Sequence, residues 1–170
     1  ELKMDTDEMR YQRLNVATAF HSPVVSSSVQ PFGAFLADVS FSEAHIPAWS
    51  GESASVYERD ASEQRARLSR QIANPVRFVS LLEALSGQGI RTFVEVGPGS
   101  VLTGLARRTL DKKTHRAIAL DRKGKGGIVA FYKGIAQLLA AGVSMDLAAL
   151  WRGYGEPEIR EERQKARLGV

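Results

Sequence analysis

Apolar residues recur along this chain with two different spacings, and each spacing predicts a different kind of element. Leu14 and Val16 alternate with polar neighbours, which predicts a strand over residues 11–20. From Pro23, steps of four and three residues predict an amphipathic helix through Val25, Val29, Phe32, Leu36 and Val39. Pro31 lies inside that helix and should kink or restart it, because proline lacks the backbone donor. A second short strand fits residues 45–50.

The middle of the chain predicts two helices separated by a proline break. Asp60, followed three residues later by Glu63, forms a capping box and predicts a helix that runs to about Ile72. Asn74-Pro75 ends it, because the residue before a proline is disfavoured in the helical region. A second helix then has apolar residues at Val76, Val79, Leu82 and Leu85, with a left-handed stop at Gly87 or Gly89.

Strands and helices alternate after this break, which predicts the α/β fold class. Residues 91–96 predict a buried strand, Gly97-Pro98-Gly99 a tight turn, and Ser100 the cap of a helix. A further strand fits residues 116–120, and a glycine-rich segment leads into a helix over 128–139. Asp146 should cap a last short helix that ends near Trp151, and the charged stretch 156–167 should be a solvated helix or linker.

Composition excludes several classes of function. The 170 residues contain no cysteine, which excludes a disulfide scaffold, thiolate metal sites and a cysteine nucleophile, and favours the cytoplasm. The net charge of +4 comes from scattered Lys and Arg, so we expect no nucleic-acid partner. No apolar run is long enough to span a membrane. The chain opens on a charged stretch at Glu1, and we expect it to be a piece of a longer protein.

His21 is the one histidine in a setting suited to chemistry, at the end of the first predicted strand. A neutral imidazole there can accept a proton from a nucleophile, although it could equally satisfy hydrogen bonds at the strand end. His45 and His115 favour structural roles, and the three histidines lack ligand spacing, so we predict no metal site. The serine-elbow pattern G-x-S-x-G is absent from the chain.

Two glycine-rich segments invite a phosphate-binding interpretation. Residues 97–100 precede a helix, but they match neither common phosphate-loop pattern, and a close strand-to-helix turn explains both glycines. Residues 122–127 could contact phosphates, but their glycine content favours a flexible linker.

Three blocks carry a resemblance to a known family: Ala19-Phe20-His21-Ser22-Pro23, residues 70–78 (RQIANPVRF) and residues 93–105 (FVEVGPGSVLTGL). In this order they resemble the C-terminal half of the acyltransferase domains of malonyl-CoA:acyl carrier protein transacylases and of polyketide and fatty acid synthases. Residues 130–151 are similar to the linker that follows this domain in multidomain synthases. The resemblance covers about residues 10–152.

The resemblance implies roles for four residues. His21 matches the base that activates the serine nucleophile, and Gln71 matches the position whose main-chain carbonyl holds the other imidazole nitrogen. Phe20 lies in the specificity motif and implies malonyl, because Ala-Phe-His is associated with malonyl and Ala-Ser-His with methylmalonyl units. Asn74 follows on the same wall of the substrate site. The chain departs from the family pattern at Thr18 and at Ser50-Gly51.

The resemblance also implies an architecture and a set of partners. Residues 1–57 would be part of a ferredoxin-like small subdomain, 58–121 the end of an α/β-hydrolase-like large subdomain, 122–155 the post-acyltransferase linker and 156–170 a charged tail. The serine would lie in an N-terminal half outside this sequence, which we expect to associate with the chain. The substrates would be an acyl-CoA and the phosphopantetheine of an acyl carrier protein, with no tightly bound cofactor. The alternative is a non-catalytic module that docks a carrier protein or braces neighbouring synthase domains.

Overall fold

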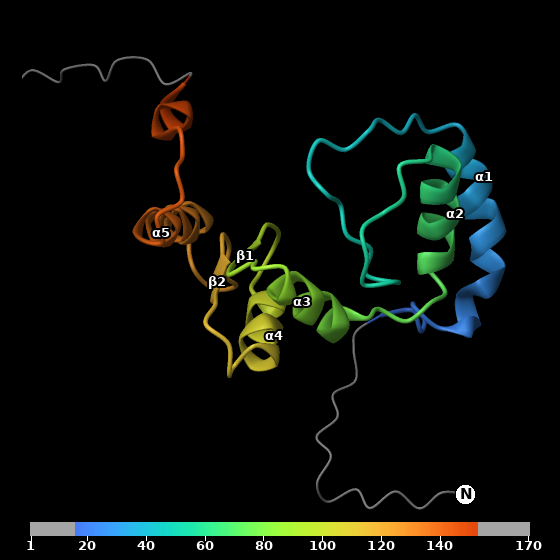
Figure 1. Cartoon of the computed structure of the whole chain (residues 1–170), viewed down its shortest axis with the longest axis horizontal. Helices are drawn as coiled ribbons and strands as arrows, with labels where there is room; N and C mark the ends of the chain where they lie inside the picture. Colours follow the sequence, from blue (N-terminus) through green and yellow to red (C-terminus); the bar gives the residue numbers. More distant parts are fainter. Residues whose placement is uncertain (1–15, 153–170) are drawn as a thin grey trace, which may run out of the picture. The chain divides into compact units, whose positions relative to one another are not determined.

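A computed structural model describes residues 16–152 of the chain (Figure 1). In order, the elements are η1 (Pro23–Ser28), α1 (Val29–Ala37), α2 (Ala61–Gln71), α3 (Phe78–Gly87), β1 (Thr92–Glu95), α4 (Val101–Thr109), β2 (Arg116–Ala119), α5 (Gly127–Ala140) and η2 (Leu147–Trp151). The described residues divide into two compact units, 16–93 with 104–117 and 94–103 with 118–152. Within this part of the chain, no helix has the length and apolarity needed to cross a membrane.

The helices form largely where the sequence predicts them, because their signals are local. The Asp60 carboxylate accepts hydrogen bonds from the backbone N–H groups of Ser62 and Glu63, which confirms the predicted cap of α2. The first predicted helix is split into η1 and α1, and Pro31 lies in the first turn of α1, where no backbone donor is needed. Gly89, with φ 88°, is the left-handed residue that follows α3.

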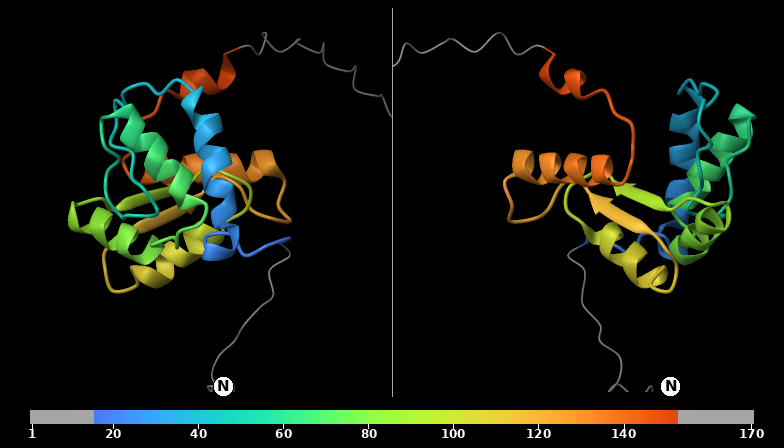
Figure 2. Two further views of the ribbon diagram at one scale, coloured as in Figure 1. Left: turned by 90° about the vertical axis from the view of Figure 1, so that its right-hand side faces the viewer. Right: turned by 60° about the vertical axis from the view of Figure 1, so that its left-hand side comes forward.

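In the first unit, α1 and α2 lie side by side (Figures 1 and 2). Gly33 allows this close approach, since a methyl group there would lie 3.6 Å from Ser69 Cβ.

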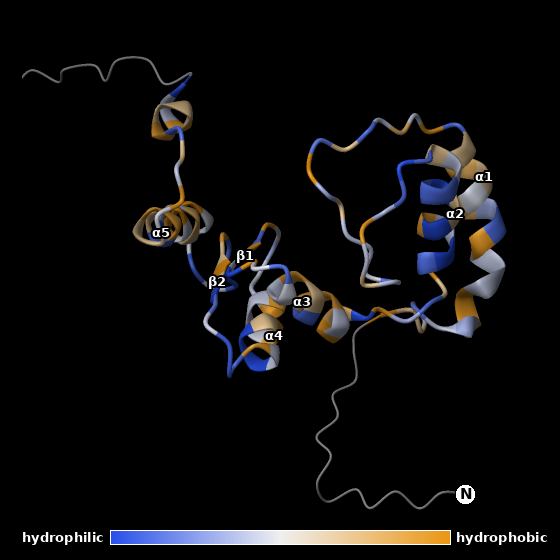
Figure 3. Ribbon diagram, viewed as in Figure 1, coloured by the Kyte–Doolittle hydropathy of each residue, from blue (hydrophilic) through white to orange (hydrophobic). Residues whose placement is uncertain are grey.

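A separate apolar core includes residues of α3 and α4. It consists of Leu82, Ala106, Leu110 and Ala117, with Phe78 and Phe93 packed against it. Figure 3 shows that α2 is mostly hydrophilic, whereas β2 and α5 are mostly hydrophobic.

The two strands form a parallel pair, as expected for an α/β fold. Arg116 N–H donates to the Arg91 carbonyl at 2.8 Å, and Leu120 N–H donates to the Glu95 carbonyl at 3.1 Å, so both strands advance in the same direction. The strand predicted over 91–96 therefore exists, but it is not buried. Val94 is 40% exposed and Val96 80% exposed, because a parallel sheet is buried only when layers cover both faces.

Two predicted strands are wrong within the described residues. Residues 16–20 are irregular, with a turn in which Phe20 N–H donates to the Thr18 carbonyl, and 11–15 lie outside the described part. The strand predicted over 45–50 reduces to one isolated antiparallel bridge between Trp49 and Val56. A run of residues suited to a strand is not enough, because a strand also needs a neighbour to pair its backbone groups.

In the second unit, α5 packs closely on the end of β2. Gly134 makes this possible, because a Cβ atom there would meet Leu120 Cδ2 at 2.6 Å and the Ala119 carbonyl oxygen at 3.1 Å. Ile118, Ala119, Ala130 and Leu138 are buried in this unit. Asp146 caps η2 by accepting from Ala149 N–H, which confirms the last predicted helix start.

Candidate functional site

His21 has a backbone conformation that residues other than glycine rarely adopt. Its φ is 59°, in the left-handed region, and it follows directly after the turn at Thr18–Phe20. Ser22 then begins η1: its hydroxyl donates to the Ala19 carbonyl at 2.6 Å and accepts from Val24 N–H at 3.4 Å. The imidazole is therefore presented on an exposed corner between an irregular segment and a helix.

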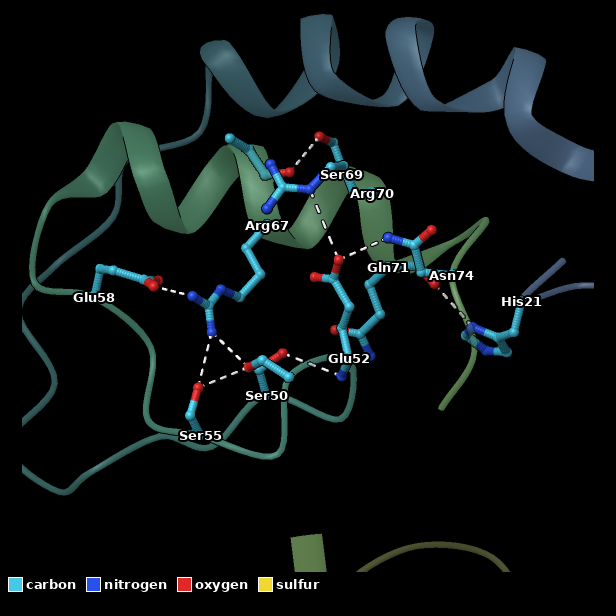
Figure 4. Close-up of polar contacts among 12 residues, drawn as sticks. His21, Ser50, Glu52, Ser55, Glu58, Arg67, Ser69, Arg70, Gln71 and Asn74 are labelled. Atoms are coloured by element: carbon cyan, nitrogen blue, oxygen red, sulfur yellow. Dashed lines mark hydrogen bonds and ion pairs between the residues drawn. The ribbon is translucent and has the colours of Figure 1, made fainter. Parts of the chain in front are cut away.

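The end of α2 holds His21 through two main-chain carbonyls. His21 Nδ1 lies 2.9 Å from the Gln71 carbonyl oxygen, and His21 N–H donates to the Ile72 carbonyl at 2.8 Å (Figure 4). Carbonyls at the end of a helix have no partner within the helix, so they are free to accept these bonds. A carbonyl only accepts, so Nδ1 carries the proton and Nε2 is the acceptor nitrogen of the neutral ring.

A turn formed by residues 50–55 lies beside Gln71 and is tied to the same end of α2. The Tyr57 hydroxyl donates to Gln71 Oε1 at 3.0 Å, so both the main chain and the side chain of Gln71 are held. Arg77 N–H donates to the Gly51 carbonyl at 2.7 Å. Glu52 Oε1 accepts from Asn74 Nδ2 at 2.6 Å and lies 3.7 Å from Arg70 Nε (Figure 4).

The turn itself is fixed by the half-buried guanidinium of Arg67 and by a residue with positive φ. Arg67 donates to the hydroxyls of Ser53 and Ser55 and pairs with Glu58. Ala54 has φ 55° and donates its N–H to the Ser50 carbonyl. Ser50, where the chain departs from the family pattern, is completely buried, and its hydroxyl accepts from Glu52 N–H.

The structure places three of the four predicted site residues in one network at the end of α2. His21 and Gln71 are hydrogen-bonded, and Asn74 is linked by Glu52 to Arg70, the residue before Gln71. Phe20 is the neighbour of His21 in the chain, and its side chain is 52% exposed. Among residues 16–152, no hydroxyl is hydrogen-bonded to His21 Nε2. A pocket of about 500 Å³ lies beside Tyr57; the residues that line it fall between 41 and 68, and His21 is not one of them.

Sequence reasoning missed Glu52 and the Tyr57 contact with Gln71. Both contacts join residues that are far apart in the sequence: Glu52 lies 22 residues before Asn74, and Tyr57 lies 14 residues before Gln71. The one local signal was the run of small and polar residues from Ser50 to Ser55, which is typical of a turn.

The glycine turn after β1 is explained by acidic side chains of the chain itself. The Glu95 carboxylate accepts from the N–H groups of Leu102 and Thr103 at 3.1 and 2.7 Å and from the Thr103 hydroxyl at 2.6 Å. Asp121 accepts from Gly99 N–H at 2.9 Å, and Gly99 has φ 87°. Desolvation raises the pKa of Glu95, but the hydrogen bonds from Thr103 and Leu102 outweigh it and hold the pKa below its usual value. Glu95 thus occupies amide donors at the start of α4 that a phosphate would need.

The chain is similar in sequence to proteins of polyketide biosynthesis. No protein-family model matches the chain. Polyketide synthase GfsA of Streptomyces halstedii is 32% identical over 154 residues, which are 90% of this chain and 2% of that protein. The polyketide biosynthesis malonyl CoA-acyl carrier protein transacylase BaeC of Bacillus velezensis is 40% identical over 102 residues, 60% of this chain and 35% of BaeC.

The solved structures agree with these sequence relatives. The acyltransferase domain from the second module of the salinomycin polyketide synthase superimposes with a TM-score of 0.71 and 28% identity, covering 86% of this chain and 35% of that domain chain. The α/β arrangement of the described residues is therefore that of an acyltransferase domain. The chain spans about a third of the length of BaeC and of the salinomycin domain.

Proposed function

We propose that this chain, which is related to the acyltransferase domains of type I polyketide synthases and to malonyl-CoA:acyl carrier protein transacylases, supplies the general base of such an enzyme. The observation that carries the proposal is the 2.9 Å contact between His21 Nδ1 and the Gln71 carbonyl. It leaves Nε2 free to accept a proton, as a base in an acyl transfer must.

In the proposed reaction, an acyl group moves from a coenzyme A thioester to a carrier protein. His21 Nε2 takes the proton of a serine hydroxyl, and the serine oxygen attacks the thioester carbonyl carbon. The carbon–sulfur bond breaks, and the departing coenzyme A sulfur takes the proton back from the imidazolium. The phosphopantetheine thiol of an acyl carrier protein then attacks the acyl serine by the same steps in reverse. The serine lies in the part of the acyltransferase that this chain does not span.

The architecture proposed with this function follows the related domains. Residues 1–57 belong to a ferredoxin-like small subdomain, 58–121 to the α/β-hydrolase-like large subdomain and 122–155 to the linker after the acyltransferase, with a charged tail over 156–170. Parallel pairing of β1 and β2 supports the second assignment, because hydrolase-like subdomains are built on a parallel sheet. The exposed Val94 and Val96 support an association with further layers of that subdomain.

The test of the catalytic role replaces His21 with alanine in the complete acyltransferase that contains this sequence. We expect the rate of radiolabelled malonyl transfer from coenzyme A to the serine to fall by about 10² or more, because the serine loses its base. His45→Ala is the matched control, since His45 is exposed and outside the network, and it should leave the rate unchanged. Unchanged acyl-enzyme formation in His21→Ala would refute the role and favour the non-catalytic docking module.

Malonyl selectivity is proposed from Phe20, with Asn74 on the same wall of the acyl site. Phe20→Ser creates the Ala-Ser-His sequence associated with methylmalonyl units. We expect the ratio of methylmalonyl to malonyl transfer to rise, since a smaller side chain beside His21 leaves room for the extra methyl group. Competition between the two thioesters, with the carrier products separated by mass, measures that ratio. A ratio that does not move would remove Phe20 from the specificity site.

A further inference from the structure

We propose that Glu52 is a positioning residue for the base, acting through the end of α2. Its carboxylate contacts Arg70 and Asn74, the first just before Gln71 and the second three residues after it. By bridging them it fixes the carbonyl that orients the His21 ring. The inference rests on the proposed role of His21 and extends it to a residue with no contact to the imidazole.

The hydrogen bond to Asn74 is the stronger part of this bridge. Glu52 Oε1 accepts from Asn74 Nδ2 at 2.6 Å, and the Glu52 side chain is only 16% exposed, so water competes poorly for the carboxylate. The Arg70 side chain is 53% exposed and its Nε lies 3.7 Å away, a geometry in which ion pairs contribute little. A neutral acceptor at position 52 should therefore retain most of the effect.

The carbonyl needs such support because it lies at a helix end. Gln71 is the last residue of α2, and terminal turns fray when nothing outside the helix holds them. Tyr57 holds the Gln71 side chain, but Glu52 spans the segment that carries the carbonyl. A displacement of about 1 Å in a catalytic group can lower a rate by about 10².

The second oxygen of Glu52 makes glutamine a useful substitution at this position. Glu52 Oε2 is buried and has no hydrogen-bond partner among residues 16–152. A buried, half-satisfied carboxylate is costly, and a neutral side chain of similar shape avoids that cost. Glu52→Gln should therefore lose little stability, while its amide oxygen still accepts from Asn74 and keeps the His21 tautomer.

The experiment measures the tautomer of His21 directly, by long-range ¹H–¹⁵N NMR of the imidazole at alkaline pH, in the complete acyltransferase that contains this sequence. In the unmodified chain we expect the form with the proton on Nδ1 to dominate. Glu52→Ala should shift the tautomer ratio by about threefold or more toward Nε2–H, and Glu52→Gln should shift it little. Glu83→Ala is the matched control, because Glu83 is an exposed glutamate on α3.

Exchanging the carboxylate at 52 and the amide at 74 distinguishes a positioning role of Glu52 from a role in folding. Asn74→Asp alone sets two carboxylates against each other and should release the His21 tautomer. Glu52→Gln combined with Asn74→Asp restores a donor–acceptor pair, now from the amide at 52 to the carboxylate at 74, and should restore the tautomer. If circular dichroism shows that Glu52→Ala is unfolded, the comparison of Asn74→Asp with the double variant decides whether Glu52 positions His21. An unchanged tautomer in both Glu52→Ala and Asn74→Asp would overturn the proposal.

Transfer assays in the complete acyltransferase distinguish this proposal from the proposed function. Glu52→Ala should lower the transfer rate by about 10-fold to 100-fold, and Glu52→Gln should stay within about threefold of the unmodified enzyme. If the tautomer changes and the transfer rate does not, Glu52 positions His21 but His21 is not the base. If both stay unchanged, Glu52 has no positioning role.

Discussion

The left-handed backbone of His21 predicts an inverted order of stability for two substitutions. At an ordinary position alanine is more stable than glycine by about 0.5–1 kcal/mol, because glycine loses more backbone entropy on folding. At φ 59° a Cβ atom adds steric strain of about 1–2 kcal/mol, which glycine removes. His21→Gly and His21→Ala both lose the bond to the Gln71 carbonyl, so this loss cancels in the comparison. His21→Gly should therefore be more stable than His21→Ala by about 0.5–1 kcal/mol.

Urea unfolding followed by circular dichroism measures this difference. With a denaturant slope of about 2 kcal/mol/M, the midpoint of His21→Gly should lie about 0.3–0.5 M above that of His21→Ala at equal protein concentration. The same two substitutions at His45, which has no positive φ, should keep the ordinary order. The reasoning fails if alanine is as stable as glycine at position 21. Both His21 variants should lower the transfer rate by about 10² or more, so stability and activity separate at this residue.

Four further substitutions test other features of the structure. Ala54→Gly should raise the free energy of unfolding by about 0.5–1 kcal/mol, because Ala54 also has positive φ; an unchanged urea midpoint would contradict this. Gly104→Ala should stabilise α4 by about 0.5–1 kcal/mol, since the new methyl group meets only Arg108 Nη1 at 3.9 Å. Gly134→Ala should instead destabilise by about 1–2 kcal/mol, because its methyl group meets Leu120 Cδ2 at 2.6 Å and the Ala119 carbonyl; thermal melts of the two variants should move in opposite directions. Folding lowers the pKa of Glu95. The carboxylate's contribution to the free energy of unfolding is therefore complete above the unfolded pKa of 4.5 and is lost as pH falls through the folded pKa. The stability difference between wild type and Glu95→Gln should shrink over that acid range.

Helices could be predicted from the sequence because their determinants lie within a few residues of one another. Asp60 and the amides that it caps are two and three positions apart, and Asp146 caps η2 over a similar span. The sequence predicts strands at 11–20 and 45–50, but a strand forms only where a neighbour pairs its backbone groups, and among the described residues these segments form only the Trp49–Val56 bridge. Periodicity contains no information on that neighbour. Residues 92–95 form a strand because β2 pairs with them, 25 residues further along the chain.

In the site, too, features set by neighbouring residues could be predicted from the sequence, and contacts between residues far apart in the sequence could not. His21 could be singled out by its local setting, but its pairing with Gln71 joins residues 50 positions apart and was predicted only through the family resemblance. Glu52 gave no such signal, because a glutamate in a polar turn is ordinarily solvated. Its importance follows from burial and from the contact with Asn74, and both arise only after the turn at 50–55 folds against α2.

The strained backbone conformation of His21 depends on the last turn of α2. The left-handed conformation costs about 1–2 kcal/mol, and the two bonds to the Gln71 and Ile72 carbonyls, at 2.9 and 2.8 Å, contribute about 0.5–1.5 kcal/mol each. The conformation is therefore stable only while both carbonyls stay in place. Any change that frays the last turn of α2 removes both bonds together, and the backbone of His21 is then free to relax to negative φ. The ring and the backbone should consequently lose their orientation at the same time, and in the proposed role Glu52 acts on His21 by this route without touching it.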